Sequence, residues 1–176
     1  MTLQTTSDGK VINHTVFGSQ LQACLRSDEA FAALGDVGFG FQDGGCRVLA
    51  HALTAWCSRH GIVSRIVAVG RPGQQDHIVC AIKVDDGWVY ADSDGVATGP
   101  EMIEKLARLE LTPGAQITDY DPAACDQANI GSLAEEGVPG RLARFLVRYL
   151  EPPPLGEWKV LQEAVAPRAT VVRLAP

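Results

Sequence analysis

One cysteine, one histidine and one aspartate are spaced along the chain in a way that could support nucleophilic catalysis. Cys46 follows two glycines and begins a stretch with helical periodicity, His77 begins an apolar strand pattern, and Asp92 ends the next strand pattern. A thiol becomes a nucleophile when it ionises, and a helix N-terminus and a nearby imidazolium both stabilise the thiolate. A carboxylate on the second imidazole nitrogen then orients the histidine. These three residues therefore supply the parts of a Cys-His-Asp site.

The aspartate of this site has two candidates. A two-residue Asp86-Gly87 turn between the strands would make Asp94 the same-face diagonal neighbour of His77 and would leave Asp92 too far along its strand. A longer connection or a bulge would instead bring Asp92 up to His77. The geometry expected from the residues alone leaves both aspartates open.

The loop before Cys46 supplies candidates for the substrate cleft. Gly44 and Gly45 allow a substrate to approach the backbone and leave N–H groups facing the site. Gln42 is the candidate side-chain donor to an oxyanion, together with the backbone N–H of Cys46. A solvent-exposed loop glutamine is an equally good interpretation of Gln42.

Length and composition are those of one globular domain. The chain has 176 residues, of which 46% are apolar and 20% are charged. A net charge of −6 and a pI of about 5.1 argue against nucleic acid as the main partner and against an anionic membrane, because both need a positive field. No apolar run approaches the roughly 20 residues that span a bilayer, and residues 1–18 lack a signal-peptide pattern. We therefore expect a cytoplasmic protein.

The cysteines favour a reduced protein. They lie at positions 24, 46, 57, 80 and 125, an odd number without a CxxC pair. Cys57 and Cys80 fall within apolar patterns, where a free thiol packs like a small hydrophobe. This favours a reducing compartment without a disulfide framework. His77 and Cys80 are three residues apart on one strand pattern and point to opposite faces, so we expect no bound metal and no other cofactor.

Hydrophobic periodicity predicts an α+β order of elements. Helical spacing covers residues 20–34, 46–60, 100–111 and 138–150, and strand patterns cover 62–69, 77–84, 88–91, 116–120 and 170–174. The helix at 46–60 is apolar over a wide arc and should be buried, and Gly61 is a typical residue just past a helix end. We expect a single domain over residues 1–151 with its core at about 42–120, followed by a proline-rich linker and tail over 152–176.

The residues around the three candidates resemble the transglutaminase-like superfamily. Residues 44–46 fit the G-x-C pattern at the start of the family's helix, with an alanine four residues on, and residues 61–67 fit the G-I-x-x-R-x-V that leads into its first strand. His77, Trp88 and Asp92 fit its second motif, which has Trp eleven and Asp fifteen residues after the His. This spacing selects Asp92 over Asp94. The resemblance covers about residues 42–96.

The chain also departs from the family pattern. Val79 and Ala81 stand where the family often has Trp and Glu, and Ser93-Asp94 stands in place of a Pro-Thr pair. The substrate-facing walls therefore cannot be carried over from the family. Trp88 and Asp94 join the two glycines as cleft candidates.

The resemblance implies a papain-like or transglutaminase-like fold, in which a central helix bearing Cys46 packs on an antiparallel sheet that carries His77 and Asp92. It implies acyl transfer through a thioester, with Cys46 as nucleophile, His77 as proton carrier and Asp92 orienting the histidine. Hydrolysis of an amide in a peptide, a small molecule or a protein is the expected reaction, since water needs no second binding site. The same residues would serve a transglutaminase or an N-acyltransferase with an amine acceptor.

A non-catalytic protein-interaction domain on the same fold is the alternative from another class. The predicted helix at 138–150 carries a basic face, with arginines at 141, 144 and 148, and leaves room for a partner protein.

Overall fold

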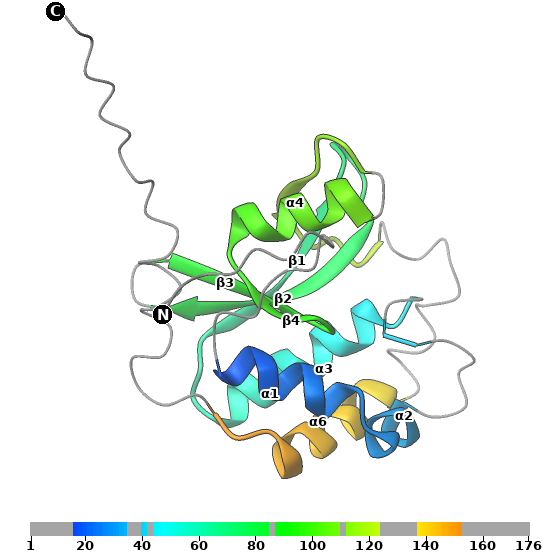
Figure 1. Ribbon diagram of the computed structural model, residues 1–176, viewed down its shortest axis with the longest axis vertical. Helices are drawn as coiled ribbons and strands as arrows, with labels where there is room; N and C mark the ends of the chain where they lie inside the picture. The colour runs from blue at the N-terminus through cyan, green and yellow to red at the C-terminus, as the bar shows by residue number, and fades with distance from the viewer. Residues whose placement is uncertain are drawn as a thin grey trace, which may run out of the picture.

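Helices cover both faces of a five-stranded antiparallel sheet, so the chain has the expected α+β class (Figure 1). The computed structural model describes residues 16–34, 40–41, 44–84, 87–109, 112–123 and 137–152. Its helices are α1 Val16–Leu25, α2 Asp28–Leu34, α3 Cys46–Arg59, α4 Gly99–Leu109 and α6 Val138–Tyr149. Its strands are β1 Ser64–Gly70, β2 His77–Val84, β3 Gly87–Asp92, β4 Gly95–Ala97 and β5 Gln116–Asp119, in the spatial order β4-β3-β2-β1-β5.

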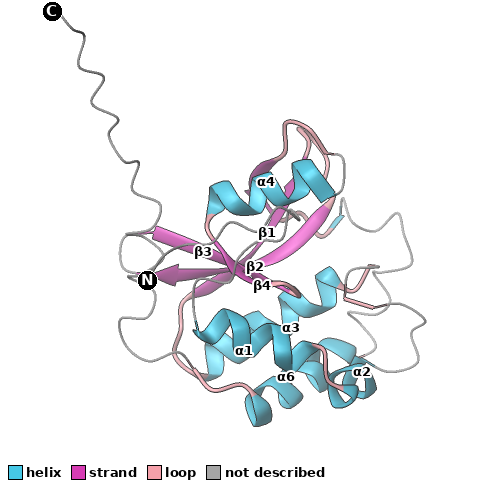
Figure 2. Ribbon diagram, in the orientation of Figure 1, coloured by secondary structure: helices cyan, strands magenta, loops and turns pink. Residues whose placement is uncertain are grey.

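The central strand β2 is apolar along nearly all of its length because both of its faces are covered. On one face Val79 and Ala81 pack with Met102 and Leu106 of α4. On the opposite face lie α1, α3 and α6, whose apolar side chains form the larger core cluster (Figure 2). The sheet therefore separates α4 from the other helices, and its ends are where groups from the two sides can meet.

Helix α3 is the buried helix that its apolar arc predicts. Trp56 is fully buried, stacks on Phe17 at a centroid distance of 5.4 Å, and donates its indole N–H to the carbonyl of Leu150 at 3.2 Å. The helix ends where expected, since Gly61 follows it with φ of +68°, a conformation that glycine adopts without strain. The contact with Leu150 ties the end of α6 to α3, which carries Cys46.

The single helix expected over residues 20–34 is wrong, because the structure has two helices there. Ser27 accounts for the break. Its hydroxyl donates to the carbonyl of Cys24 at 2.8 Å and accepts the N–H of Ala30 at 3.2 Å, which ends α1 and caps α2. Asp28 and Glu29 then occupy the first turn of α2, where negative charge is favourable. The Ser-Asp-Glu run is the local signal for this boundary.

The expected register of the β2–β3 hairpin is also wrong. Val84 pairs with Gly87, so Gly87 belongs to β3 and not to the turn. The expected turn was one residue later, which shifts the pairing by two positions. A shift of two leaves every side chain on its face, so the hydrophobic pattern does not choose between these registers. In the observed register Lys83 pairs with Trp88 and lies over its indole ring at 5.6 Å.

Other expectations agree with the structure to within a few residues. The strand over 77–84 has the predicted bounds, and the helices and strands predicted near α4, α6, β1 and β5 are present. The short strand β4 was not predicted. The strand pattern at 170–174 and the linker and tail after 152 lie outside the described residues. No helix in the described part of the chain has the length and apolar character that crossing a bilayer requires.

Candidate active site

The first turn of α3 is built around a close approach of two backbone segments. The N–H of Gly45 donates to the carbonyl of Gly40 at 3.1 Å, and a Cβ on Gly45 would lie 2.7 Å from that oxygen. Only glycine fits this approach. Gly44 precedes it with φ of +100°. The expectation that both glycines leave N–H groups facing the site is therefore wrong for Gly45, whose role is to seat the start of the helix.

Cys46 is the first residue of α3 and is half-buried against a small apolar cluster that includes Ala50 and Ile78. The N-cap residue makes no side-chain capping bond, so the electropositive end of the helix faces the thiol without a competing side chain. The backbone N–H groups of Arg47 and Ile78 both donate to the sulfur. The helix terminus and the start of β2 therefore converge on Cys46.

His77 and Asp92 meet at the same end of the sheet. Continuing the β2–β3 register one position beyond the pair Cys80–Ala91 sets Asp92 opposite Val79. Asp92 is then a diagonal neighbour of His77 on the same face of the sheet. The Nε2 atom of His77 lies 3.0 Å from Oδ2 of Asp92, and their exposed fractions are 7% and 3%. Because an ionised carboxylate only accepts, Nε2–H donates this bond.

The remaining ring nitrogen of His77 serves the thiol. The side chains of His77 and Cys46 are hydrogen-bonded to each other. Nε2 is engaged by Asp92, so this bond falls to Nδ1. One imidazole thus bridges the sulfur on α3 and the carboxylate at the end of β3, which is the order that a nucleophile, a proton carrier and an orienting group require.

The environment favours the charged forms of the thiol and the imidazole. Burial raises the pKa of the Cys46 thiol, but the hydrogen bond and charge of His77, with the two backbone N–H donors, more than offset it, so the net pKa is lowered. For His77, burial works to lower the pKa, while the hydrogen bonds to Asp92 and Cys46 and their charges raise it to about 10. Both shifts favour a thiolate–imidazolium pair.

Asp92 stays ionised although it is buried. Desolvation would raise its pKa, yet the bonds and charges of His77 and Lys105 lower it to about 2. Its second oxygen, Oδ1, accepts the N–H of Asp94 at 2.9 Å. Both carboxylate oxygens are therefore held by donors, which fixes the plane of the group that orients His77.

Lys105 is a member of the site that sequence reasoning missed. It lies on α4 with 7% exposure, and its Nζ is 2.5 Å from Oδ2 of Asp92 and 2.5 Å from Oδ2 of Asp94. Its position three residues after Met102 and one before Leu106 puts it on the apolar arc of α4, which is the one signal that could have found it.

The start of α4 sets where Lys105 falls. Thr98 and Glu101 form a capping box, in which the Thr98 N–H donates to Oε2 of Glu101 at 2.8 Å and the Glu101 N–H donates to the Thr98 hydroxyl at 3.4 Å. The helix therefore begins directly after β4, and its second turn brings Lys105 over the end of β3.

Two other predicted site residues, Asp94 and Trp88, have identified contacts of their own. Asp94 accepts from the ammonium of Lys105 through its carboxylate, and its backbone N–H donates to the Asp92 carboxylate. Trp88 lies four residues before Asp92 on β3, about 13 Å along the strand, where the guanidinium of Arg65 covers its ring at 4.7 Å. Trp88 therefore lies away from His77 and Asp92. The oxyanion candidate Gln42 lies outside the described residues.

The loop between β1 and β2 borders the site from the strand side. Arg71 donates through its backbone N–H and its guanidinium to the carboxylate of Asp76, the residue before His77. Gln75 exchanges two hydrogen bonds with the backbone of Asp121, both at 2.9 Å. These bonds join the loop to the segment after β5, in which Tyr120 contacts the ring of His51 and the guanidinium of Arg47, the residue after Cys46.

The remaining described cysteines are structural by position. Cys57 and Cys80 are both fully buried between α3 and β2, and Cys80 accepts a hydrogen bond from the hydroxyl of Thr54 at 3.6 Å. The hydrogen bond with Cys57, together with burial, raises the pKa of the Cys80 thiol. The expectation that these two thiols pack as apolar groups is confirmed.

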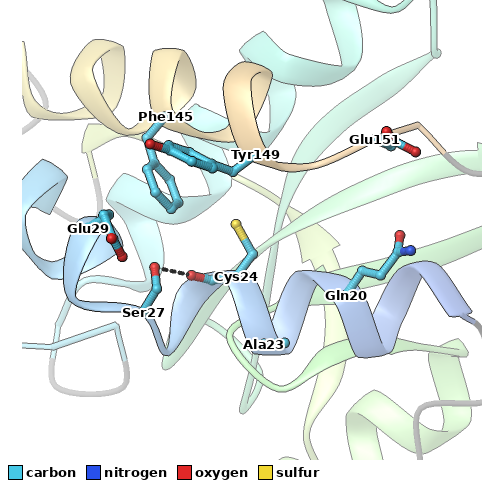
Figure 3. Close-up of a pocket in the computed structure, with 8 residues that line it drawn as sticks. All are labelled: Gln20, Ala23, Cys24, Ser27, Glu29, Phe145, Tyr149 and Glu151. Carbon is cyan, nitrogen blue, oxygen red and sulfur yellow. Dashed lines mark hydrogen bonds between the residues drawn. The ribbon is translucent and has the colours of Figure 1, made fainter.

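Cys24 faces a separate hollow between α1 and α6, with a volume of about 450 Å³. In Figure 3 its sulfur points towards the rings of Phe145 and Tyr149, with Glu151 at one end of the hollow and Glu29 at the other. Burial raises the pKa of the Cys24 thiol, which makes it a poor nucleophile. The lining of this hollow includes none of the residues around Cys46.

The described residues hold no group of three or more His, Cys, Asp or Glu side chains arranged to bind a metal ion. Instead, the thiol of Cys46, the imidazole of His77 and the carboxylate of Asp92 contact one another in that order, and the ammonium of Lys105 contacts the carboxylate. Comparisons with models of protein families, with curated proteins and with solved structures found no match.

Proposed function

We propose that the protein is a cysteine-dependent hydrolase of amide bonds, of the transglutaminase-like or papain-like type. One observation carries this proposal: the imidazole of His77 is hydrogen-bonded to the Cys46 thiol on one side and to the Asp92 carboxylate on the other, 3.0 Å away. This is the arrangement that converts a thiol into a nucleophile and keeps a proton ready for a leaving group.

The order of elements supports the same type of fold. The buried helix that begins at Cys46 precedes an antiparallel sheet in which His77 begins one strand and Asp92 ends the next. This is the order that the resemblance of residues 42–96 to the transglutaminase-like superfamily implies. Asp92 is also the aspartate that contacts His77, in agreement with the spacing of the family's second motif.

In the proposed acylation step, the Cys46 thiolate attacks the carbonyl carbon of the amide and forms a tetrahedral intermediate. The C–N bond then breaks as the imidazolium of His77 gives its proton to the leaving amine. The products of this step are a thioester on Cys46 and a free amine or ammonia. Asp92 holds the Nε2 side of the ring throughout, so that Nδ1 stays directed at the sulfur and the leaving nitrogen.

In the proposed deacylation step, neutral His77 takes a proton from water, and the hydroxide formed attacks the thioester. The C–S bond breaks, the carboxylic acid leaves, and the thiolate–imidazolium pair is restored. The backbone N–H of Cys46, at the uncapped end of α3, is the donor that we assign to the oxyanion. Gln42 stays a prediction as the second donor.

The proposed substrate is an amide in a peptide or a small molecule, with a protein substrate also within this class. The free thiols of Cys24, Cys46, Cys57 and Cys80 support a reducing compartment such as the cytoplasm. The acidic chain disfavours nucleic acid and anionic membranes as partners.

The test supplies an activated acyl donor, such as an aryl ester or a glutamine-containing peptide, with and without a fluorescent primary amine. Wild type is compared with Cys46→Ala and with the matched control Cys24→Ala, which removes a thiol remote from His77. Leaving-group release, ammonia release, amine incorporation and the mass of a trapped thioester are measured.

Release without amine incorporation, lost in Cys46→Ala and kept in Cys24→Ala, is the expected result. Amine incorporation that outpaces hydrolysis would replace the hydrolase by a transferase on the same site. Absence of a thioester with every donor would contradict an enzymatic function and would favour an interaction domain, for which the exposed arginines of α6 (141, 144 and 148) offer a surface.

The choice of aspartate has its own test. Asp92→Ala should lower turnover by a factor of about 100 or more, because His77 loses the group that orients it, whereas Asp94→Ala should keep most of the activity. Initial rates with the best donor from the preceding experiment measure this. An inactive Asp94→Ala beside a nearly active Asp92→Ala would show that the assignment of the third residue is wrong.

A further inference from the structure

A buried ammonium group shares the oxygen that orients His77. Lys105 Nζ lies 2.5 Å from Oδ2 of Asp92, and the same Oδ2 accepts Nε2–H of His77 at 3.0 Å. The ammonium also lies 2.5 Å from Oδ2 of Asp94. One cation from α4 therefore bridges two carboxylates of the β3–β4 turn, on the side of Asp92 that faces the histidine.

We propose that Lys105 is a positioning residue of this site, which acts through Asp92 by sharing the oxygen that binds His77 and by offsetting the charges of Asp92 and Asp94. The proposal rests on the proposed function, because it assigns to Lys105 a part in proton transfer at Cys46. It gives α4, on the other face of the sheet from α3, a part in the chemistry.

Burial makes a purely space-filling role for this lysine unfavourable. An ammonium group taken out of water costs several kcal/mol unless it is paired, whereas an apolar side chain beside Met102 and Leu106 would carry no such cost. Lys105 is 7% exposed, and the groups that offset its burial are Asp92 and Asp94. The desolvation cost of burying Lys105 is therefore incurred at the position where its ammonium group contacts Asp92.

The charges around His77 show what the sharing does. The titratable groups that act on His77 are Asp92 on β3 and Cys46 on α3, and those that act on Lys105 are Asp92 and Asp94. Without Lys105, His77 would be the only cation paired with the Asp92 carboxylate, and the charge of the neighbouring Asp94 carboxylate would not be offset by the ammonium. The imidazolium would then hold its proton more tightly and would transfer it more slowly to a leaving amine.

The pKa of His77 should therefore rise or fall according to which neighbouring charge is removed. Lys105→Met should raise the pKa of His77, and Asp94→Asn should lower it, because the ammonium then acts on Asp92 alone. Combining the two substitutions removes one positive and one negative charge, so the pKa should return towards that of the parent. A lysine that served only packing or stability would not produce this pattern.

The experiment measures the pKa of His77 by ¹⁵N-histidine NMR in a Cys46→Ala parent, which lacks the thiol, one of the two groups that raise this pKa. Lys105→Met, Asp94→Asn, the double variant and Lys105→Arg are compared in that parent. We expect opposite shifts of roughly one pH unit for the two single charge removals. The double variant and Lys105→Arg should lie close to the parent.

A His77 pKa that is unchanged or lowered in Lys105→Met would overturn the proposal. If Lys105→Met does not fold, Asp94→Asn carries the test: a lowered pKa supports the charge sharing, and an unchanged one contradicts it. This readout does not depend on turnover, so failure of the proposed hydrolase and failure of the role of Lys105 are separate results. In an active enzyme with Cys46 restored, Lys105→Met should slow thioester formation, and adding Asp94→Asn should recover part of the rate.

Discussion

Replacing Asp92 with Asn should remove a defined, acid-sensitive part of the stability of the protein. Ion pairing with His77 and Lys105 outweighs desolvation and lowers the pKa of Asp92 from 3.8 to about 2. A carboxylate whose folded-state pKa is depressed contributes stability that is present above its unfolded-state pKa and is lost as the pH falls through the folded-state value. The fall from 3.8 to about 2 corresponds to about 2 kcal/mol in total.

The pH window follows from these two values. Wild type should lose about 1 kcal/mol of this contribution between pH 5 and pH 3, and about 2 kcal/mol by pH 2. His77 is protonated in both the folded and the unfolded states below pH 5, since its pKa is only raised in the fold. It therefore adds no slope in this window, and the difference between wild type and Asp92→Asn isolates the carboxylate.

The assay is urea unfolding followed by far-UV circular dichroism at pH 5, 4, 3 and 2. Asp92→Asn also breaks a buried ion pair, which costs about 3 kcal/mol at every pH above the window. The quantity to compare is therefore how the difference in unfolding free energy between variant and wild type changes with pH. Asp119→Asn is the control, because its pairing with Arg65 is exposed and contributes little.

The gap between wild type and Asp92→Asn should narrow by about 2 kcal/mol from pH 5 to pH 2, while the gap for Asp119→Asn stays flat. A gap for Asp92→Asn that stays constant to within about 0.5 kcal/mol would refute the reasoning. It would mean that the pairing of Asp92 with His77 and Lys105 does not stabilise its ionised form in solution.

Three further predictions concern the elements that carry the site. Iodoacetamide at a pH of about 6 should label Cys46 well before Cys24 in the folded protein, because one pKa is lowered and the other raised; equal labelling by peptide mass spectrometry would count against the site. Gly45→Ala should lower the unfolding free energy by about 2 kcal/mol, since its Cβ would lie 2.7 Å from a backbone oxygen, whereas Gly140→Ala in α6, with ordinary 3.7 Å contacts, should not lower it. Ser27→Ala should cost about 1 kcal/mol in the same urea assay through loss of the cap of α2, and no measurable cost would contradict that role.

The candidate site divides into a part that local sequence predicts and a part that it does not. The helix from Cys46 and the strands around His77 and Asp92 follow from hydrophobic periodicity. An element that buries one face or both faces needs apolar residues at regular spacings along the chain. The hairpin register does not follow, since a two-residue shift preserves that pattern. The contact of His77 with Asp92 was therefore selected by motif spacing and not by strand geometry.

What the sequence determined by itself is the set of candidate residues and the elements that carry them: the thiol at a helix start, the histidine at a strand start and the aspartate at a strand end. These depend on interactions between residues close in the chain. Tertiary structure alone decided that Lys105 faces Asp92, that Gly45 is closed against Gly40, and that Trp88 lies far from the site. A buried lysine is stable only beside groups of opposite charge. For Lys105 these groups come from another element, so its role can be recognised only in the folded structure.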